Sequence, residues 1–128
     1  MYVTDAHGFL WFLSKDKRLG KKALEIFRAC DKGAEIVVVP SIVLLECMYI
    51  CEKKRIAFEF REVMLKIQGT VNYPIYPLDE EVVSECQNFS KITEAHDRII
   101  VATTKLLNAK LITKDVNITN SKTVETVW

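Results

Sequence analysis

The sequence lacks an excess of charge of either sign. Lys and Arg together number 18, and Asp and Glu together number 17, which gives a formal net charge of +1. A chain this close to neutrality has no general electrostatic field that would attract nucleic acid or an anionic membrane. Any site for a polyanion must therefore come from the local arrangement of charged residues.

The sequence also lacks a hydrophobic run of the roughly 20 residues that cross a membrane. Its longest mainly apolar stretch, 36–51, is interrupted by Pro40, Ser41 and Glu46. The first residues lack the basic segment, apolar core and small-residue cleavage site of a secretory signal. We therefore expect no membrane-spanning segment and a cytoplasmic location.

Cysteine pairs with metal-binding spacing are absent as well. The four cysteines, Cys30, Cys47, Cys51 and Cys86, include no Cys-x-x-Cys pair, and we expect reduced thiols rather than a zinc site. Internal repeats, low-complexity segments and linkers are also missing. The 128 residues fit one domain of ordinary size, so residues 1–128 are expected to fold as a single unit.

What the sequence does contain is an alternation of strand-like and helix-like segments. Strands are predicted near 2–4, 35–40, 73–77, 111–113 and 123–127, and helices near 6–13, 23–33, 42–56, 57–68, 79–89 and 97–107. The β-branched run at 35–40 is typical of a central strand buried on both faces of a parallel sheet, and Ser41 is predicted to cap the next helix. This order predicts an α/β fold, a three-layer sandwich around a mostly parallel, roughly five-stranded sheet.

Four acidic residues lie where predicted strands end or the following helices begin. Asp5 follows the first strand, and Glu46 lies in the opening turns of the helix after the central strand. Asp97 begins a later helix, and Asp115 follows the strand at 111–113. Ligands of open parallel sheets bind outside the carboxyl ends of the strands. These four acids are therefore expected to meet at one edge of the sheet.

Glu46 is the sharpest local signal, because it is a carboxylate inside the otherwise apolar sequence 41–50. Its burial without a partner would be costly, and clustered carboxylates repel one another. A divalent cation removes both penalties, and Mg²⁺ or Mn²⁺ suits an all-oxygen ligand set. Such an ion lowers the pKa of bound water and stabilises charge on a phosphodiester under in-line attack. The pattern therefore indicates phosphodiester hydrolysis.

Each acid also has an ordinary structural interpretation. Asp5 and Asp97 suit helix caps, and Asp115 suits a turn. Glu46 suits an ion-paired acid of the core. Taken singly, these interpretations are favoured, but together they require four coincidences at one edge of the sheet. The joint pattern favours a metal site.

Four segments of the sequence resemble the successive motifs of PIN domains. They are Val3-Thr-Asp-Ala-His-Gly-Phe-Leu-Trp-Phe-Leu13, Glu46 in its apolar helix, His96-Asp-Arg-Ile-Ile-Val-Ala102 and Leu111-Ile-Thr-Lys-Asp115. The similarity spans nearly the entire chain, and it is closest to the VapC-like toxins of toxin–antitoxin modules. The extended segment Tyr76-Pro-Leu-Asp-Glu-Glu81, which leads into a helix, resembles the same group.

The resemblance implies a single PIN-like nuclease domain over residues 1–128. It implies that Asp5, Glu46, Asp97 and Asp115 are the acidic catalytic and metal-site residues, and that Thr113 helps to position the last acid or a bound water. It further implies an endoribonuclease that depends on Mg²⁺ or Mn²⁺ and acts on an RNA substrate. A cognate antitoxin and a homodimer are the protein partners that the resemblance implies.

Two cationic residues beside proposed metal ligands are candidates for binding the substrate. Arg98 follows Asp97 and Lys114 precedes Asp115, so each has a charge that suits phosphate oxygens. The basic runs at 15–22 and 53–55 are further candidates, although both suit a solvated surface.

Histidine and tryptophan are given non-catalytic roles. His7 and His96 are assigned none in catalysis, because water activated by a metal needs no histidine base. Trp11 is expected to pack in the core or at a dimer face rather than to stack on bases.

Other functions remain open at this stage. A PIN-domain nuclease that processes RNA outside a toxin module and a catalytically silent RNA-binding or scaffold module share the same motifs. A receiver domain of phosphorelay signalling shares the α/β layout and the acidic edge. It fits less well, because Asp5 stands alone after the first strand and the central strand ends in Pro40-Ser41.

Overall fold

The computed structural model describes residues 1–128, which form five β-strands, seven α-helices and one 3₁₀ helix. The strands are β1 (Tyr2–Thr4), β2 (Val37–Pro40), β3 (Ile75–Tyr76), β4 (Lys110–Ile112) and β5 (Thr126–Val127). The helices are α1 (Ala6–Leu13), α2 (Lys21–Asp31), α3 (Ser41–Glu52), α4 (Phe60–Gln68), α5 (Glu80–Glu85), the 3₁₀ helix η1 (Cys86–Phe89), α6 (Ala95–Leu106) and α7 (Val116–Ser121).

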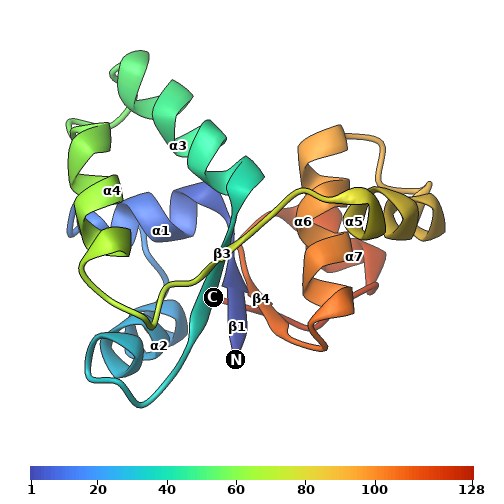
Figure 1. Ribbon diagram of the computed structural model, residues 1–128, viewed down its shortest axis with the longest axis horizontal. Helices are drawn as coiled ribbons and strands as arrows, with labels where there is room; N and C mark the ends of the chain where they lie inside the picture. Colours follow the sequence, from blue (N-terminus) through green and yellow to red (C-terminus); the bar gives the residue numbers. More distant parts are fainter.

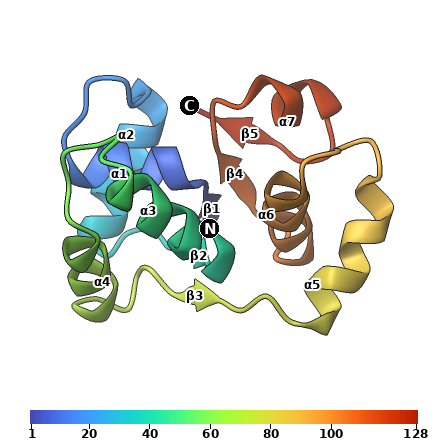
Figure 2. The same ribbon diagram turned by 90° about the horizontal axis from the view of Figure 1, so that it is seen from above.

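The five strands form one parallel sheet in the order β3-β2-β1-β4-β5. Helices α1 to α4 cover one face of this sheet, and α5, α6 and α7 cover the other (Figures 1 and 2). The prediction of a three-layer α/β sandwich is therefore confirmed. All five strands are parallel, so the carboxyl ends of every strand lie along the same edge.

The core lies on both faces of the central strands. The side chains of Val37 and Val39 on β2, Val3 on β1 and Leu111 on β4 are fully buried. The β-branched run of β2 is thus a strand buried on both faces, as its sequence predicts. Burial of these strands on both faces fixes their register in the sheet. The register in turn determines which residues lie side by side at the carboxyl ends of neighbouring strands.

Two predicted helix boundaries differ from the structure. The helix predicted over 42–56 ends at Glu52, because Lys54 adopts a left-handed backbone with φ of 52° and α4 begins only at Phe60. Ser41 is not the cap of α3 but its first residue. Its Oγ instead accepts a hydrogen bond of 3.1 Å from the Leu78 amide, which ties the segment after β3 to the start of α3.

Helix α7 was not predicted, because Val116-Asn-Ile-Thr-Asn-Ser121 contains no strong helix former. A local cap and one buried side chain stabilise the helix instead. Asp115 caps the helix by accepting hydrogen bonds from the amides of Asn117 and Ile118, and the Ile118 side chain is buried. The cap thus places a predicted site residue at a helix start.

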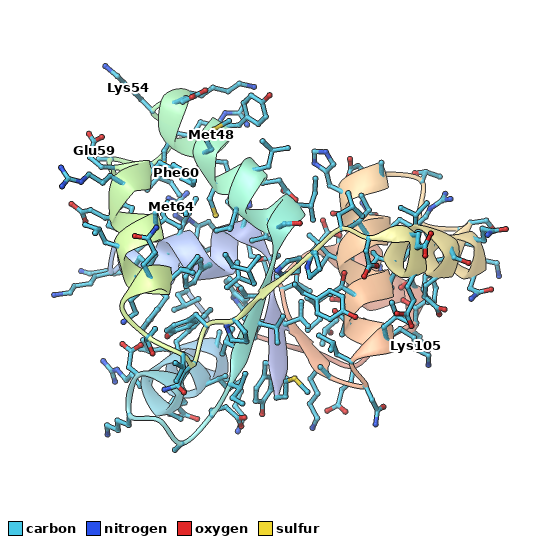
Figure 3. The ribbon with its side chains drawn as sticks, in the orientation of Figure 1. Met48, Lys54, Glu59, Phe60, Met64 and Lys105 are labelled. Atoms are coloured by element: carbon cyan, nitrogen blue, oxygen red, sulfur yellow. The ribbon has the colours of Figure 1, made fainter.

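Side chains of α3 and α4 meet at the outer end of the first helical layer. Figure 3 shows Met48 of α3 together with Phe60 and Met64 of α4 where these helices face each other. None of the four cysteines forms a disulfide, as expected. No helix combines the length and the apolar character needed to cross a bilayer.

Candidate metal centre

Asp5 is the most firmly held of the four predicted acids. It follows β1 and caps α1, where its Oδ1 accepts a hydrogen bond of 2.7 Å from the Gly8 amide. Its Oδ2 accepts a hydrogen bond of 2.6 Å from the Thr113 hydroxyl. Burial raises the pKa of Asp5, although both hydrogen bonds oppose this shift by stabilising the carboxylate.

Thr113 connects Asp5 to Asp115 across two neighbouring strands. Its hydroxyl donates to Asp5 and accepts a hydrogen bond of 3.1 Å from the Asp115 amide. Strands β1 and β4 pair directly, with Thr4 opposite Ile112, so the residues that follow them lie side by side. Because Asp115 uses only its Oδ1 to cap α7, its Oδ2 remains available to a ligand.

Glu46 lies on α3, and its side chain is 24% exposed. Its Oε1 atom is buried and accepts no hydrogen bond. The nearest cationic candidate is Nδ1 of His96, which lies 3.8 Å from that oxygen. Burial, followed by repulsion from Asp5, Asp97 and Glu94, raises the pKa of Glu46 to about 7. No lysine or arginine forms an ion pair with Glu46, and His96 is its one basic partner.

Asp97 lies in the first turn of α6, and like Glu46 it is partly buried and close to other acids. Burial raises its pKa to about 6, and repulsion from Asp115, Glu94 and Asp5 adds to the shift. Asp5 is likewise repelled by Asp115. The structure therefore brings all four predicted acids into one electrostatically coupled group at the carboxyl edge of the sheet.

One neighbour of this group, Glu94, was not recognised in the sequence, and another, His96, was given no catalytic role there. Glu94 caps α6 by accepting a hydrogen bond of 2.9 Å from the Asp97 amide, and it repels both Asp97 and Glu46. Glu94 directly precedes the first residue of α6, but glutamate is not among the residues that usually cap a helix, so the sequence offers little signal of this role. His96, in the same turn of α6 as Asp97, lies 3.8 Å from Glu46. Only the packing of α3 near α6 reveals this contact.

The chemistry of these side chains suits a divalent cation, because carboxylates are hard oxygen ligands. As placed, no three acidic, histidine or cysteine side chains form a compact ligand set for a metal ion. Burial raises the pKa of Glu46 and of Asp97, and repulsion from the neighbouring carboxylates raises both further. A cation would remove the repulsion and give the orphaned Glu46 oxygen a partner. Carboxylates of this kind suit Mg²⁺ or Mn²⁺.

The two cationic candidates for substrate binding have different surroundings. The Arg98 guanidinium donates hydrogen bonds to the carbonyls of Ile92 at 2.8 Å and Ser90 at 3.2 Å, so it holds the loop before α6. The Lys114 ammonium lies 4.6 Å from the centre of the Trp11 ring, and Arg18 lies at the same distance. Phosphate binding by Arg98 and Lys114 stays a prediction.

Comparison with known proteins identifies the family of the chain. The sequence profile of the PIN domain matches residues 2–121 of the chain. The chain belongs to the PIN-domain family. PIN domains are generally nucleases, and this membership excludes the receiver-domain alternative.

Solved structures that resemble this PIN domain include three toxin–antitoxin proteins. VapBC2 from Rickettsia felis, bound to a DNA fragment from its promoter, has a TM-score of 0.72 at 14% identity over 99% of this chain and 98% of that chain. A toxin–antitoxin complex from Klebsiella pneumoniae has a TM-score of 0.70 at 14% identity, over 100% of this chain and 97% of that chain. VapC20 from Mycobacterium tuberculosis, a toxin that cleaves the sarcin–ricin loop, has a TM-score of 0.70 at 12% identity over 98% of each chain.

These identities are low, so the structural similarity shows the fold alone. A search of curated protein sequences found no significant match. The assignment of this chain to the PIN domains therefore rests on the family profile, and the roles of its acids stay predictions.

Replacing Gly8 of this PIN domain by alanine is expected to weaken Mn²⁺ binding without removing an acid. An added Cβ would lie 3.0 Å from Asp5 Oδ1 and 3.3 Å from Thr4 Oγ1, so the Asp5 carboxylate must shift. Stability should change little, because the gain in helix propensity of about 1 kcal/mol offsets the steric cost. Calorimetric titration with Mn²⁺ and a thermal melt measure the two effects. An unchanged Mn²⁺ affinity would contradict this role of Gly8.

Replacing Thr113 by valine keeps the shape of the side chain and removes the hydroxyl that joins Asp5 to Asp115. Substitutions that disturb the orientation of metal ligands typically weaken binding by about 10- to 100-fold, and we expect a Mn²⁺ affinity lower by this factor. The control is Thr113→Ser, which keeps the hydroxyl and should restore most of the affinity. Equal affinities of the valine and serine variants would refute the positioning role.

Proposed function

We propose that this PIN domain is a metal-dependent endoribonuclease that hydrolyses RNA phosphodiester bonds with Mg²⁺ or Mn²⁺. The observation that carries the proposal is the carboxylate of Glu46, whose buried Oε1 accepts no hydrogen bond and whose charge is repelled by Asp5, Asp97 and Glu94. A folded protein tolerates such a group when a ligand supplies positive charge. In a family of nucleases, a divalent cation is the ligand that also has a use in catalysis.

The proposed ligands are Asp5, Glu46, Asp97 and Asp115. A cation held by them would lower the pKa of a water molecule and offset negative charge on the phosphodiester. The chain itself supplies orientation: Gly8 and Thr113 fix the two oxygens of Asp5, and the cap of α7 fixes Asp115. Because α3 and α6 lie on opposite faces of the sheet, Glu46 and Asp97 approach the site from two sides (Figure 1).

We further propose that the chain acts as the toxin of a toxin–antitoxin pair in the cytoplasm. The similar structures are described as toxin–antitoxin complexes and, in one case, as a toxin that cleaves the sarcin–ricin loop, which supports an RNA substrate and an antitoxin partner for this chain. A homodimer is part of the same proposal. RNA processing outside a toxin module uses the same chemistry and differs only in the partner.

The test is cleavage of a structured RNA by the purified chain in Mn²⁺ or Mg²⁺, with a chelator as the first control. We expect cleavage that requires the metal and is lost in Asp5→Asn and Asp97→Asn. Both variants remove charge while retaining side-chain shape, and circular dichroism verifies that they fold. Calorimetry should show Mn²⁺ uptake by the unmodified chain and much weaker uptake by both variants.

Two results would overturn the nuclease proposal. Binding of RNA without cleavage in either metal would support a catalytically silent scaffold. Cleavage that persists in both asparagine variants would point to a contaminating nuclease or to other residues. Co-purification with a small DNA-binding protein encoded beside the chain would support the toxin role over RNA processing.

A further inference from the structure

A polar pocket adjoins the acidic group on the side of α7. It has a volume of about 350 Å³ and is lined by Lys91, Ile92, Thr93, Glu94, Asp97, Asn117, Asn120 and Ser121. Ligand sites generally range from about 300 to 1,000 Å³, so this pocket suits a single small group. Because Asp97 belongs both to the pocket wall and to the proposed metal centre, a group bound here lies next to the reacting phosphate.

Both walls of the pocket are held by internal hydrogen bonds. Arg98 binds the carbonyls of Ser90 and Ile92 and so fixes the loop that forms one wall. On the other wall, the Ser121 hydroxyl bonds to the Ile118 carbonyl at 2.5 Å and to Thr123 at 2.8 Å. A wall that is already ordered loses little conformational entropy when a ligand binds.

The charge of the pocket favours a nucleobase over a phosphate. Lys91 is its only cation, whereas Glu94 and Asp97 are both acidic. A phosphate would be repelled by these carboxylates, but a base is neutral and offers donors and acceptors. Single-stranded RNA is commonly recognised through splayed-out bases that are hydrogen-bonded along their edges.

The hydrogen-bonding groups in the pocket distinguish among bases. Asn117 and Asn120 are exposed on α7, and their side-chain amides make no hydrogen bond within the chain. Asparagine pairs with the amino group and ring nitrogen of adenine, and a glutamate accepts from the amino group of cytosine. Glu94 uses Oε2 to cap α6, which leaves Oε1 free as an acceptor. Uracil lacks an amino group and would present a carbonyl to this acid.

We propose that this pocket binds the base beside the phosphodiester that is cut, and that it prefers adenine or cytosine to uracil. The inference rests on the proposed ribonuclease function and names the part of the substrate that the same site selects. Asn120 and Glu94 are the specificity-determining residues, and Arg98 positions the loop that leads to Glu94.

The first test needs neither metal nor cleavage. Adenosine, cytidine and uridine are titrated separately into the isotopically labelled chain, and the side-chain amide resonances of Asn117 and Asn120 are followed by NMR. We expect these resonances to shift with adenosine or cytidine and to shift much less with uridine. Equal shifts with all three nucleosides, or no shift with any of them, would overturn the base preference.

The second test is cleavage of a randomised RNA pool in Mn²⁺, followed by sequencing of the cut ends. The unmodified chain should cut next to adenine or cytosine about tenfold more often than next to uracil, since one good base contact supplies a discrimination of this order. Asn120→Leu should flatten this preference. Glu94→Gln, which adds a donor, should raise the share of cuts beside uracil. The matched control is Asn88→Leu, at an exposed position of η1 outside the pocket.

The outcomes separate the two proposals. If the unmodified chain cuts no RNA but the nucleosides shift the asparagine resonances, the ribonuclease proposal fails and the pocket remains a base site. If the chain cuts RNA and the pocket variants keep its cut-site profile, the base pocket fails and the ribonuclease stands. Binding of an arginine-rich peptide that Glu94→Gln abolishes, together with an unchanged profile, would assign the pocket to a cationic protein side chain instead.

Discussion

Replacing Glu46 by glutamine is expected to abolish RNA cleavage and, at the same time, to stabilise the metal-free protein at pH 8. The buried Oε1 accepts no hydrogen bond, and burial together with three neighbouring acids raises the pKa of Glu46 to about 7. Glutamine removes the charge and adds an amide that can donate to the nearby carboxylates. We expect a gain of roughly 1 to 2 kcal/mol after allowance for solvent screening. Cleavage should be lost because a proposed cation ligand is gone.

The measurement combines thermal melts in a chelator with the RNA cleavage assay. A gain of this size raises the melting temperature of a chain of 128 residues by several degrees. The matched control is Glu52→Gln on the same helix, where the side chain is exposed and the substitution should change neither stability nor cleavage. A less stable Glu46→Gln protein would contradict this prediction and show that the contact with His96 outweighs burial and repulsion.

The stability of the metal-free protein is expected to fall as the pH rises from about 4 to 8. The pKa of Glu46 is raised from 4.5 to about 7, and that of Asp97 from 3.8 to about 6. The folded state therefore binds these protons more tightly than the unfolded state does. The resulting stability is fully present below the unfolded pKa values and is lost as the pH passes through the folded ones. The lowered pKa values of Asp16 and Glu35 act in the opposite direction, below this window.

Mn²⁺ should reverse this dependence, because the cation binds the deprotonated carboxylates. The rise in melting temperature on adding Mn²⁺ is expected to be large at pH 8 and small at pH 5. Melts across this range, with chelator and with Mn²⁺, measure both effects. The control is Asp97→Asn, in which the pH dependence should be shallower and the response to Mn²⁺ weaker. A metal-free stability that increases steadily from pH 5 to pH 8 would contradict the clustering of the acids.

The fold was predictable from the sequence where hydrophobic pattern and burial agree. The β-branched residues of β2 are buried on both faces, and the predicted helix over 6–13 has the bounds of α1. Prediction failed where tertiary contacts override local preference. Helix α7 exists because Asp115 caps it and Ile118 is buried, although its residues are poor helix formers. The left-handed backbone of Lys54 had no glycine or proline to signal it.

The convergence of the four acids on one edge of the sheet was predictable, but their contacts were not. Asp5, Glu46, Asp97 and Asp115 were selected by their positions relative to strand ends, and the parallel sheet brings those ends together. The roles of these acids stay predictions. Which acids come close to each other, such as Glu94 and Glu46, depends on how α3 and α6 pack. The sequence pattern does not indicate such pairs.

The hydrogen bond between Asp5 and Thr113 joins residues that lie 108 positions apart. While the chain is being synthesised, a ribosome that has exposed only the first hundred residues presents Asp5 without the strand and hydroxyl that orient it. The nascent chain therefore cannot complete the acidic edge until β4 and Thr113 have left the ribosome and β4 has paired with β1.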